Sequence, residues 1–135
     1  YWGDRHAAIF MGPERAANMS PARWALDAGV RFSSHLDTPV TPMLPLQAIW
    51  SQVKRESTGG VVIGPAQRIG RMPALRAVTI DAAWQVFMDD EIGSIEPGKR
   101  ADLVVLSENP LTAKDIRGIK VDRTVIDGAP VYTRL

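Results

Sequence analysis

The sequence predicts an α/β fold followed by a smaller β unit, and two observations carry this prediction. In residues 1–90, helix-type patterns flank one short apolar run, which is the order expected when helices cover a sheet. In residues 91–135, runs of β-branched residues are separated by Pro-Gly and Asp-Gly pairs, which is typical of strands joined by tight turns. We therefore predict two parts, with a boundary near residue 90.

Two short helices and a strand are predicted at the start of the chain. Residues 12–19 (GPERAANM) place a proline in the first helical turn, where its missing N–H costs nothing. Residues 20–29 (SPARWALDAG) repeat this pattern, with Ser20 as the expected cap and Gly29 as the left-handed end. Residues 30–37 (VRFSSHLD) then alternate in polarity and are short enough to form a strand.

Two longer helices are predicted between residues 45 and 90, after a proline-rich loop. The first has apolar residues at i, i+3, i+4 and i+7, which form the stripe of an amphipathic helix: Leu46, Ile49, Trp50 and Val53. The second begins at Pro73 and has a comparable stripe of Leu75, Val78, Ala82 and Val86. Aromatic burial dominates packing, so we expect three tryptophans in the core: Trp24, Trp50 and Trp84.

The last third of the chain is predicted to be β structure. Pro97 and Gly98 suit the two central positions of a type II turn. Residues 101–106 (ADLVVL) read as a buried strand, with the carboxylate of Asp102 accepting nearby backbone N–H groups. The pair at 127–128 (DG) predicts a hairpin between two further strands.

The composition excludes several classes of protein. Sixteen Lys and Arg residues are balanced by 15 Asp and Glu, so no basic surface indicates a nucleic-acid or membrane partner. The absence of cysteine excludes disulfides and thiolate metal sites. No apolar run is long enough to cross a membrane, and the first residues lack a signal-peptide pattern. We expect a cytoplasmic location.

Several motifs, in order along nearly the whole chain, resemble the C-terminal part of the metal-dependent amidohydrolase superfamily, in the branch that contains N-substituted formamide deformylase. They are YWGDRH, GPERAA, HLDTPVTP, PLQAIW, ALRAVTIDAAW, GSIEPGKRADLVVLSENPL and VDRTVIDGAPVY. The resemblance implies a C-terminal fragment of a (β/α)8 TIM-type barrel in residues 1–90. It also implies that residues 91–135 form a small β unit of a composite β-sandwich domain. Catalysis is then expected at the C-terminal mouth of the barrel.

The resemblance assigns the catalytic role to Asp37, the third residue of the motif HLDTPV. In the family, the aspartate at this place lies beside a divalent metal and takes part in its ligation. Such a carboxylate can accept a proton from water and return it to the leaving amine. An aspartate before Thr-Pro is also common in ordinary turns. His35 is either a residue that orients a ligand or a packed histidine, and His6 is a candidate for lining the substrate pocket.

The rest of the family's site is not found in this sequence. The His-x-His motif, the bridging ligand and the two further histidines are missing, and the chain has only two histidines. A catalytic metal generally needs at least three protein ligands. A typical barrel also needs about 250 residues. We therefore expect no tightly bound metal on this chain alone, and a divalent metal, with zinc first, in the complete enzyme.

Two functions stay open at this point. The chain is either the C-terminal part of a hydrolase that cleaves a C–N bond of an amide or formamide, inactive alone, or a non-catalytic remnant that associates with other chains. The expected partners are a small amide-type substrate in the complete enzyme, and either a second copy of the chain or a missing N-terminal portion. Manganese, iron and nickel suit the same nitrogen and oxygen ligands as zinc.

Overall fold

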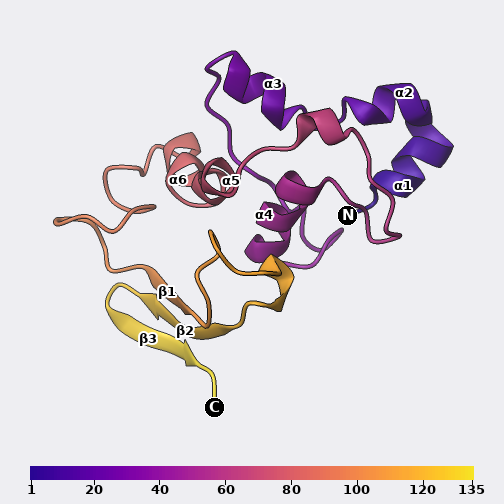
Figure 1. The fold of residues 1–135 in the computed structure, drawn as a ribbon. Helices are drawn as coiled ribbons and strands as arrows, with labels where there is room; N and C mark the ends of the chain where they lie inside the picture. The colour runs from indigo at the N-terminus through magenta and orange to yellow at the C-terminus, as the bar shows by residue number, and fades with distance from the viewer.

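The computed structural model describes all 135 residues, with the helices at one end and a small sheet at the other (Figure 1). The helical elements of the first part are α1 (Gly3–Arg5), η1 (His6–Met11), α2 (Gly12–Ala17), α3 (Ala22–Asp27), α4 (Pro45–Lys54), η2 (Pro65–Gln67), α5 (Arg71–Ala77) and α6 (Ile80–Gln85). The second part contains β1 (Leu103–Leu106), η3 (Ile116–Gly118), β2 (Val121–Ile126) and β3 (Ala129–Thr133).

Helix α4 occupies the centre of the molecule and confirms the predicted amphipathic helix. Pro45 stands in its first turn, where the missing N–H leaves no hydrogen bond unmade. Ile49 and Trp50 are buried, and Leu46 and Val53 pack against the same apolar cluster. The helix ends at Arg55, whose φ of 56° breaks the helical repeat.

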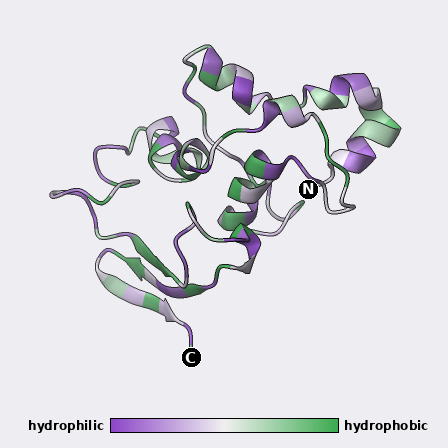
Figure 2. Ribbon diagram, in the orientation of Figure 1, coloured by the Kyte–Doolittle hydropathy of each residue, from purple (hydrophilic) through white to green (hydrophobic).

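One hydrophobic core joins the helices to the C-terminal third of the chain. Helices α4 and α5 contribute Ile49, Trp50 and Ala74, and the segment around η3 contributes Ala113, Ile116 and Ile119. Figure 2 shows the apolar residues on the inward side of α4, next to this segment. The side chain of Arg117 covers the cluster from outside, with its guanidinium carbon 4.1 Å from the centre of the Trp50 ring.

The sheet is antiparallel in the order β1-β2-β3. Its hairpin turns at Asp127 and Gly128, which both have positive φ as a type I′ turn requires, and this confirms the predicted hairpin. The predicted turn at Pro97-Gly98 is also confirmed, because Gly98 has a φ of 93° and the Lys99 N–H donates to the Glu96 carbonyl at 3.2 Å.

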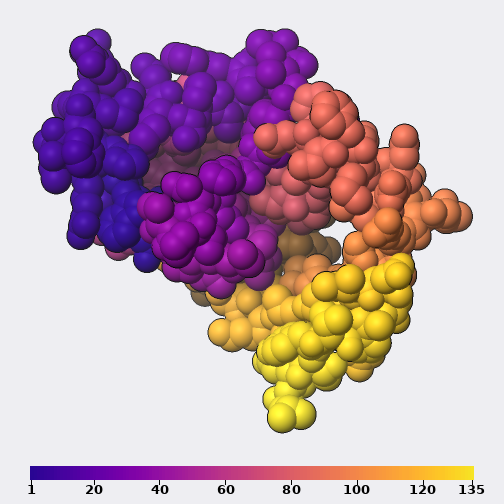
Figure 3. All heavy atoms as spheres, turned by 180° about the vertical axis from the view of Figure 1, so that it is seen from behind, coloured from indigo at the N-terminus to yellow at the C-terminus, as the bar shows by residue number.

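The prediction of a buried strand at 101–106 was wrong in one respect. Strand β1 forms and its Leu106 packs against the core, but Val104 and Val105 are 54% and 50% exposed because no second sheet covers them. Seen from behind in Figure 3, the sheet protrudes at one end of the molecule. Asp102 accepts a hydrogen bond from the Asp127 N–H at 2.7 Å, so its partner lies across the sheet rather than nearby in the sequence.

The predicted strand at 30–37 is not formed. Its residues pair with no other strand, because no parallel neighbour is present in this chain, and Asp37 at its end has a left-handed φ of 58°. The TIM-type barrel therefore stays a prediction, while helices with a small antiparallel sheet are what part of a larger α/β domain would contain.

Three further expectations for the helices were wrong. The helix from Pro73 breaks at Val78 and Thr79, which divide it into α5 and α6. Trp24 and Trp84 are 55% and 40% exposed, because no further helix or strand packs over them, and only the Arg31 guanidinium lies against the Trp84 ring.

No helix is long and apolar enough to cross a membrane.

The cap of α3 also differs from the prediction. Ser20 makes no capping hydrogen bond. The side-chain oxygen of the buried Gln67 accepts from the N–H groups of Arg23 and Trp24 instead, at 3.2 and 3.3 Å. A residue far along the chain thus satisfies the free donors at the start of this helix.

Candidate functional site

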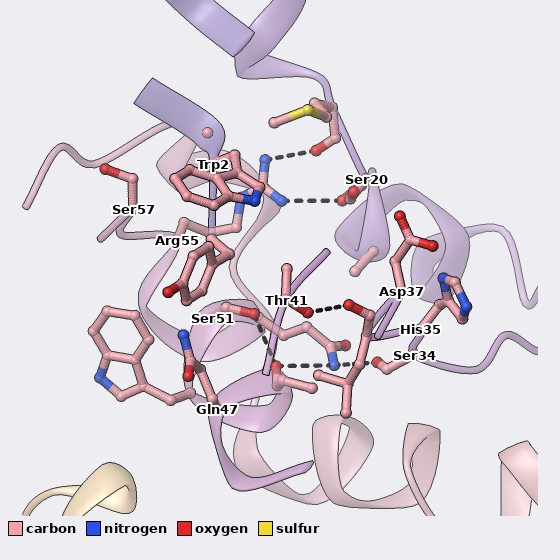
Figure 4. A pocket seen from close by; sticks show the side chains of 18 of the residues that line it. Trp2, Ser20, Ser34, His35, Asp37, Thr41, Gln47, Ser51, Arg55 and Ser57 are labelled. Carbon is pink, nitrogen blue, oxygen red and sulfur yellow. Dashed lines mark hydrogen bonds between the residues drawn. The ribbon is translucent and has the colours of Figure 1, made fainter. Parts of the chain in front are cut away.

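The three candidate residues line the same hollow, which has a volume of about 710 Å³. His6 comes from η1, while His35 and Asp37 come from the end of the extended segment that follows α3. In Figure 4, His35 and Asp37 lie on one side of the hollow, and Trp2 and Arg55 lie on the other. The structure therefore brings together side chains that are up to 31 positions apart in the sequence.

Asp37 stands at a fixed bend of the backbone. Its φ is 58°, a left-handed conformation that aspartate tolerates better than most residues. The Asp37 carbonyl accepts from the Val40 N–H at 2.7 Å, and the Thr41 hydroxyl donates to the Leu36 carbonyl. The Trp2 indole N–H donates to the Val40 carbonyl at 3.2 Å and closes the bend from the opposite wall. The backbone is thus anchored, while the Asp37 side chain is exposed to the hollow.

Arg55 is a wall residue that the sequence analysis did not single out. Its guanidinium donates to three backbone carbonyls, those of Met19 at 2.6 Å, Ser20 at 3.2 Å and Ile63 at 3.0 Å. Burial lowers the pKa of this guanidinium from its ordinary value, because the protein displaces water that would stabilise the charge. With its donors directed at these carbonyls, Arg55 joins the end of α4 to two loops rather than presenting a free cation to a ligand.

The polar groups of the hollow are accompanied by aromatic surface. Trp2, Phe32 and Trp50 belong to its lining, with hydroxyls supplied by Ser51 and Thr41. Apolar walls with a few polar groups are typical of sites for small organic molecules. The hollow can therefore accommodate a small, partly apolar molecule next to a carboxylate and two imidazoles.

These residues do not by themselves fit a divalent metal. Nowhere in the chain do three His, Cys, Asp or Glu side chains gather closely enough to hold an ion. His6, His35 and Asp37 share the hollow without forming such a group, and a catalytic metal generally needs three or more protein ligands.

Known proteins similar to this chain belong to one family. The model of the amidohydrolase family matches residues 1–132. The N-substituted formamide deformylase of Arthrobacter pascens is 39% identical over 116 residues, which cover 84% of this chain and 21% of that protein.

Two solved structures have a similar fold. An amidohydrolase from Thermotoga maritima superposes with a TM-score of 0.61 at 32% identity, over 81% of this chain and 24% of that one. The guanine deaminase of E. coli gives a TM-score of 0.61 at 26% identity, over 84% and 29% of the two chains. The chain thus spans a fifth to less than a third of the length of these relatives. From the family match along almost its entire length, this chain belongs to the amidohydrolase family.

Proposed function

We propose that this chain is the C-terminal part of a hydrolase that cleaves the C–N bond of a small amide or formamide, with Asp37 as its catalytic carboxylate. The observation that supports this most strongly is the exposed carboxylate at an anchored bend, facing a hollow shared with two histidines, in a chain of the amidohydrolase family. The choice of an amide-type substrate follows the deformylase relative.

The proposed role of Asp37 is proton transfer. Its carboxylate accepts a proton from a water molecule as the water oxygen attacks the carbonyl carbon of the substrate. It then gives that proton to the nitrogen as the C–N bond breaks, so that an acid and an amine leave. A carboxylate within hydrogen-bond reach of both oxygen and nitrogen can serve both steps.

The two histidines have a different proposed role. His6 and His35 line the hollow beside Asp37 and supply imidazole groups that can hydrogen-bond a substrate carbonyl or orient a neighbouring ligand. The aromatic walls would hold the apolar substituent of the amide.

Members of the family generally use divalent metals. Because the donors of this chain do not form a metal site alone, we propose that other parts of the complete enzyme supply the missing ligands. We expect zinc there, with Asp37 as this chain's contribution to its ligation.

A chimeric enzyme tests the proposal. The matching fifth of the Arthrobacter deformylase is replaced by this chain, and hydrolysis of an N-substituted formamide is followed by release of formate. We expect measurable turnover by the chimera and none by the deformylase that lacks this part. The unmodified deformylase, assembled by the same cloning steps, is the control for expression and metal loading. A folded, metal-loaded chimera without turnover on formamides or other small amides would contradict the proposed function and favour the non-catalytic association module.

A further inference from the structure

The extended segment that carries His35 and Asp37 is held with few backbone contacts. Residues 31–36 make a single backbone–backbone hydrogen bond, from the Ser34 N–H to the Ala77 carbonyl at the end of α5, at 2.8 Å. A strand in a sheet would instead be fixed by a ladder of such bonds. The bend at Asp37 anchors the end of the segment, so its position also depends on what holds the start.

While Phe32 packs against the hydrophobic core, Arg31 makes most of the segment's polar side-chain contacts. Its Nε lies 2.7 Å from Oδ1 of Asp81, its Nη1 lies 3.4 Å from Oδ2 of Asp89, and its Nη2 donates to the Ile80 carbonyl at 3.2 Å. The guanidinium carbon also lies 4.7 Å from the centre of the Trp84 ring. One side chain thus contacts two carboxylates, a carbonyl and an aromatic face, all on α6 or the loop after it.

Two serines add weaker contacts further along the segment. The Ser33 hydroxyl donates to the side-chain oxygen of Gln85 on α6. The Ser34 hydroxyl accepts from the side-chain amide of Gln52 on α4, a contact visible in Figure 4. The segment is therefore attached to α6 by the side chains of Arg31 and Ser33, and to α4 and α5 by the hydroxyl and the N–H of Ser34, before it reaches His35.

We propose that Arg31 is a positioning residue, which sets the place of His35 and Asp37 in the hollow by fixing the start of the extended segment to α6. The guanidinium suits this task because its planar fork can donate in several directions at once. Lysine would keep the charge but could not reach the same set of acceptors. The consequence for catalysis rests on the proposed function, whereas the effect on the segment does not.

Arg76 provides a matched control for this proposal. Its Nη2 lies 3.4 Å from the same Asp81 oxygen that Arg31 contacts, but it comes from α5 and is 53% exposed. Loss of Arg76 removes a positive charge from Asp81 without touching the extended segment. If Arg31 only stabilised the α5–α6 region through Asp81, the two substitutions would have similar effects.

The test uses NMR on the selectively labelled chimeric enzyme without substrate, because the isolated chain is expected to associate. In Arg31→Met, we expect the Ser34 amide to exchange about tenfold faster or more. We also expect the His35 ring and Asp37 carboxyl signals to shift, while the core amides of α4 stay protected. Arg76→Met should leave these signals in place, and Arg31→Lys should restore them only in part. Equal effects of Arg31→Met and Arg76→Met, or no change in either, would overturn the proposal.

Further measurements distinguish a failure of this proposal from a failure of the proposed function. If Arg31→Met fails to fold, Arg31→Lys is measured alone, and full protection of Ser34 in that variant would overturn the proposal. In the chimeric enzyme, Arg31→Met should lower kcat with little change in KM. An inactive chimera would count against the proposed function only, since the exchange and the chemical shifts are measured without substrate.

Discussion

The isolated chain should not persist as a monomer, because it exposes more surface than a folded protein of its size. Its accessible surface is 8829 Å² for a mass of 14.8 kDa. A folded monomer of that mass exposes about 7,000 Å², so the excess is about 1,800 Å². Only 15 of the 135 residues are buried, and side chains such as Phe10 and Phe87 are 72% and 94% exposed.

The excess is large compared with what a partner covers. A standard interface buries about 800 Å² on each partner, so the chain has enough excess for about two such contacts. Both faces of the sheet contribute, because Val104 and Val131 are 54% and 58% exposed and both outer strands have free edges. Apolar surface with unpaired strand edges promotes association. We therefore expect dimers or larger assemblies at micromolar concentration.

Sedimentation equilibrium over a wide range of concentrations measures this directly. Phe10→Glu combined with Val131→Lys should shift the equilibrium toward smaller species without unfolding, since both side chains are mostly exposed. A 14.8 kDa species that persists at tens of micromolar, with a sharp cooperative melt, would refute the reasoning, because it would show that the chain closes its own core.

Three further predictions concern metal, stability and pH. After dialysis and addition of zinc, the chain alone should retain no stoichiometric metal and show no amide hydrolysis, because its donors are too few, and one tightly bound zinc per chain would contradict this. Ile116→Ala should lower the free energy of unfolding in urea by about 2–5 kcal/mol, since Ile116 is 1% exposed. The control Ile126→Ala, at a 53% exposed site, should lower it much less. Equal losses in the two variants would count against the assigned core. The hydrogen bond and charge of Arg23 hold the pKa of Asp27 below its ordinary 3.8. The stabilisation of the folded chain by this ion pair is therefore complete above that pH and is lost as the pH falls below it. A titration of the Asp27 carboxyl that Arg23→Gln leaves unchanged would refute this.

Features that depend on neighbouring residues could be predicted from the sequence. The apolar stripe of α4, the turn at Gly98 and the hairpin at Gly128 each require only a few adjacent residues with the right periodicity or φ. The same holds for the bend at Asp37, where the position of the aspartate before Thr-Pro indicated the end of the segment.

Features that depend on distant residues could not be predicted. The cap of α3 comes from Gln67, and the wall at Arg55 depends on carbonyls from three separate positions. The pattern of residues 30–37 indicates a strand, but a strand forms only where another strand offers a ladder, and none does so here. The exposure of Trp84 has the same origin, since burial depends on partners that a periodic pattern does not reveal.

The central claim, that Asp37 performs the proton transfer, is tested most directly by kcat of Asp37→Asn in the chimeric enzyme. Asparagine has the same shape and also tolerates the positive φ of this bend, so it removes the basic oxygen while preserving the backbone. We predict that kcat falls by about 10²–10⁴ while the metal content per enzyme stays largely unchanged. A kcat close to that of the unsubstituted chimera, at equal metal content, would contradict the account and reduce Asp37 to a turn residue.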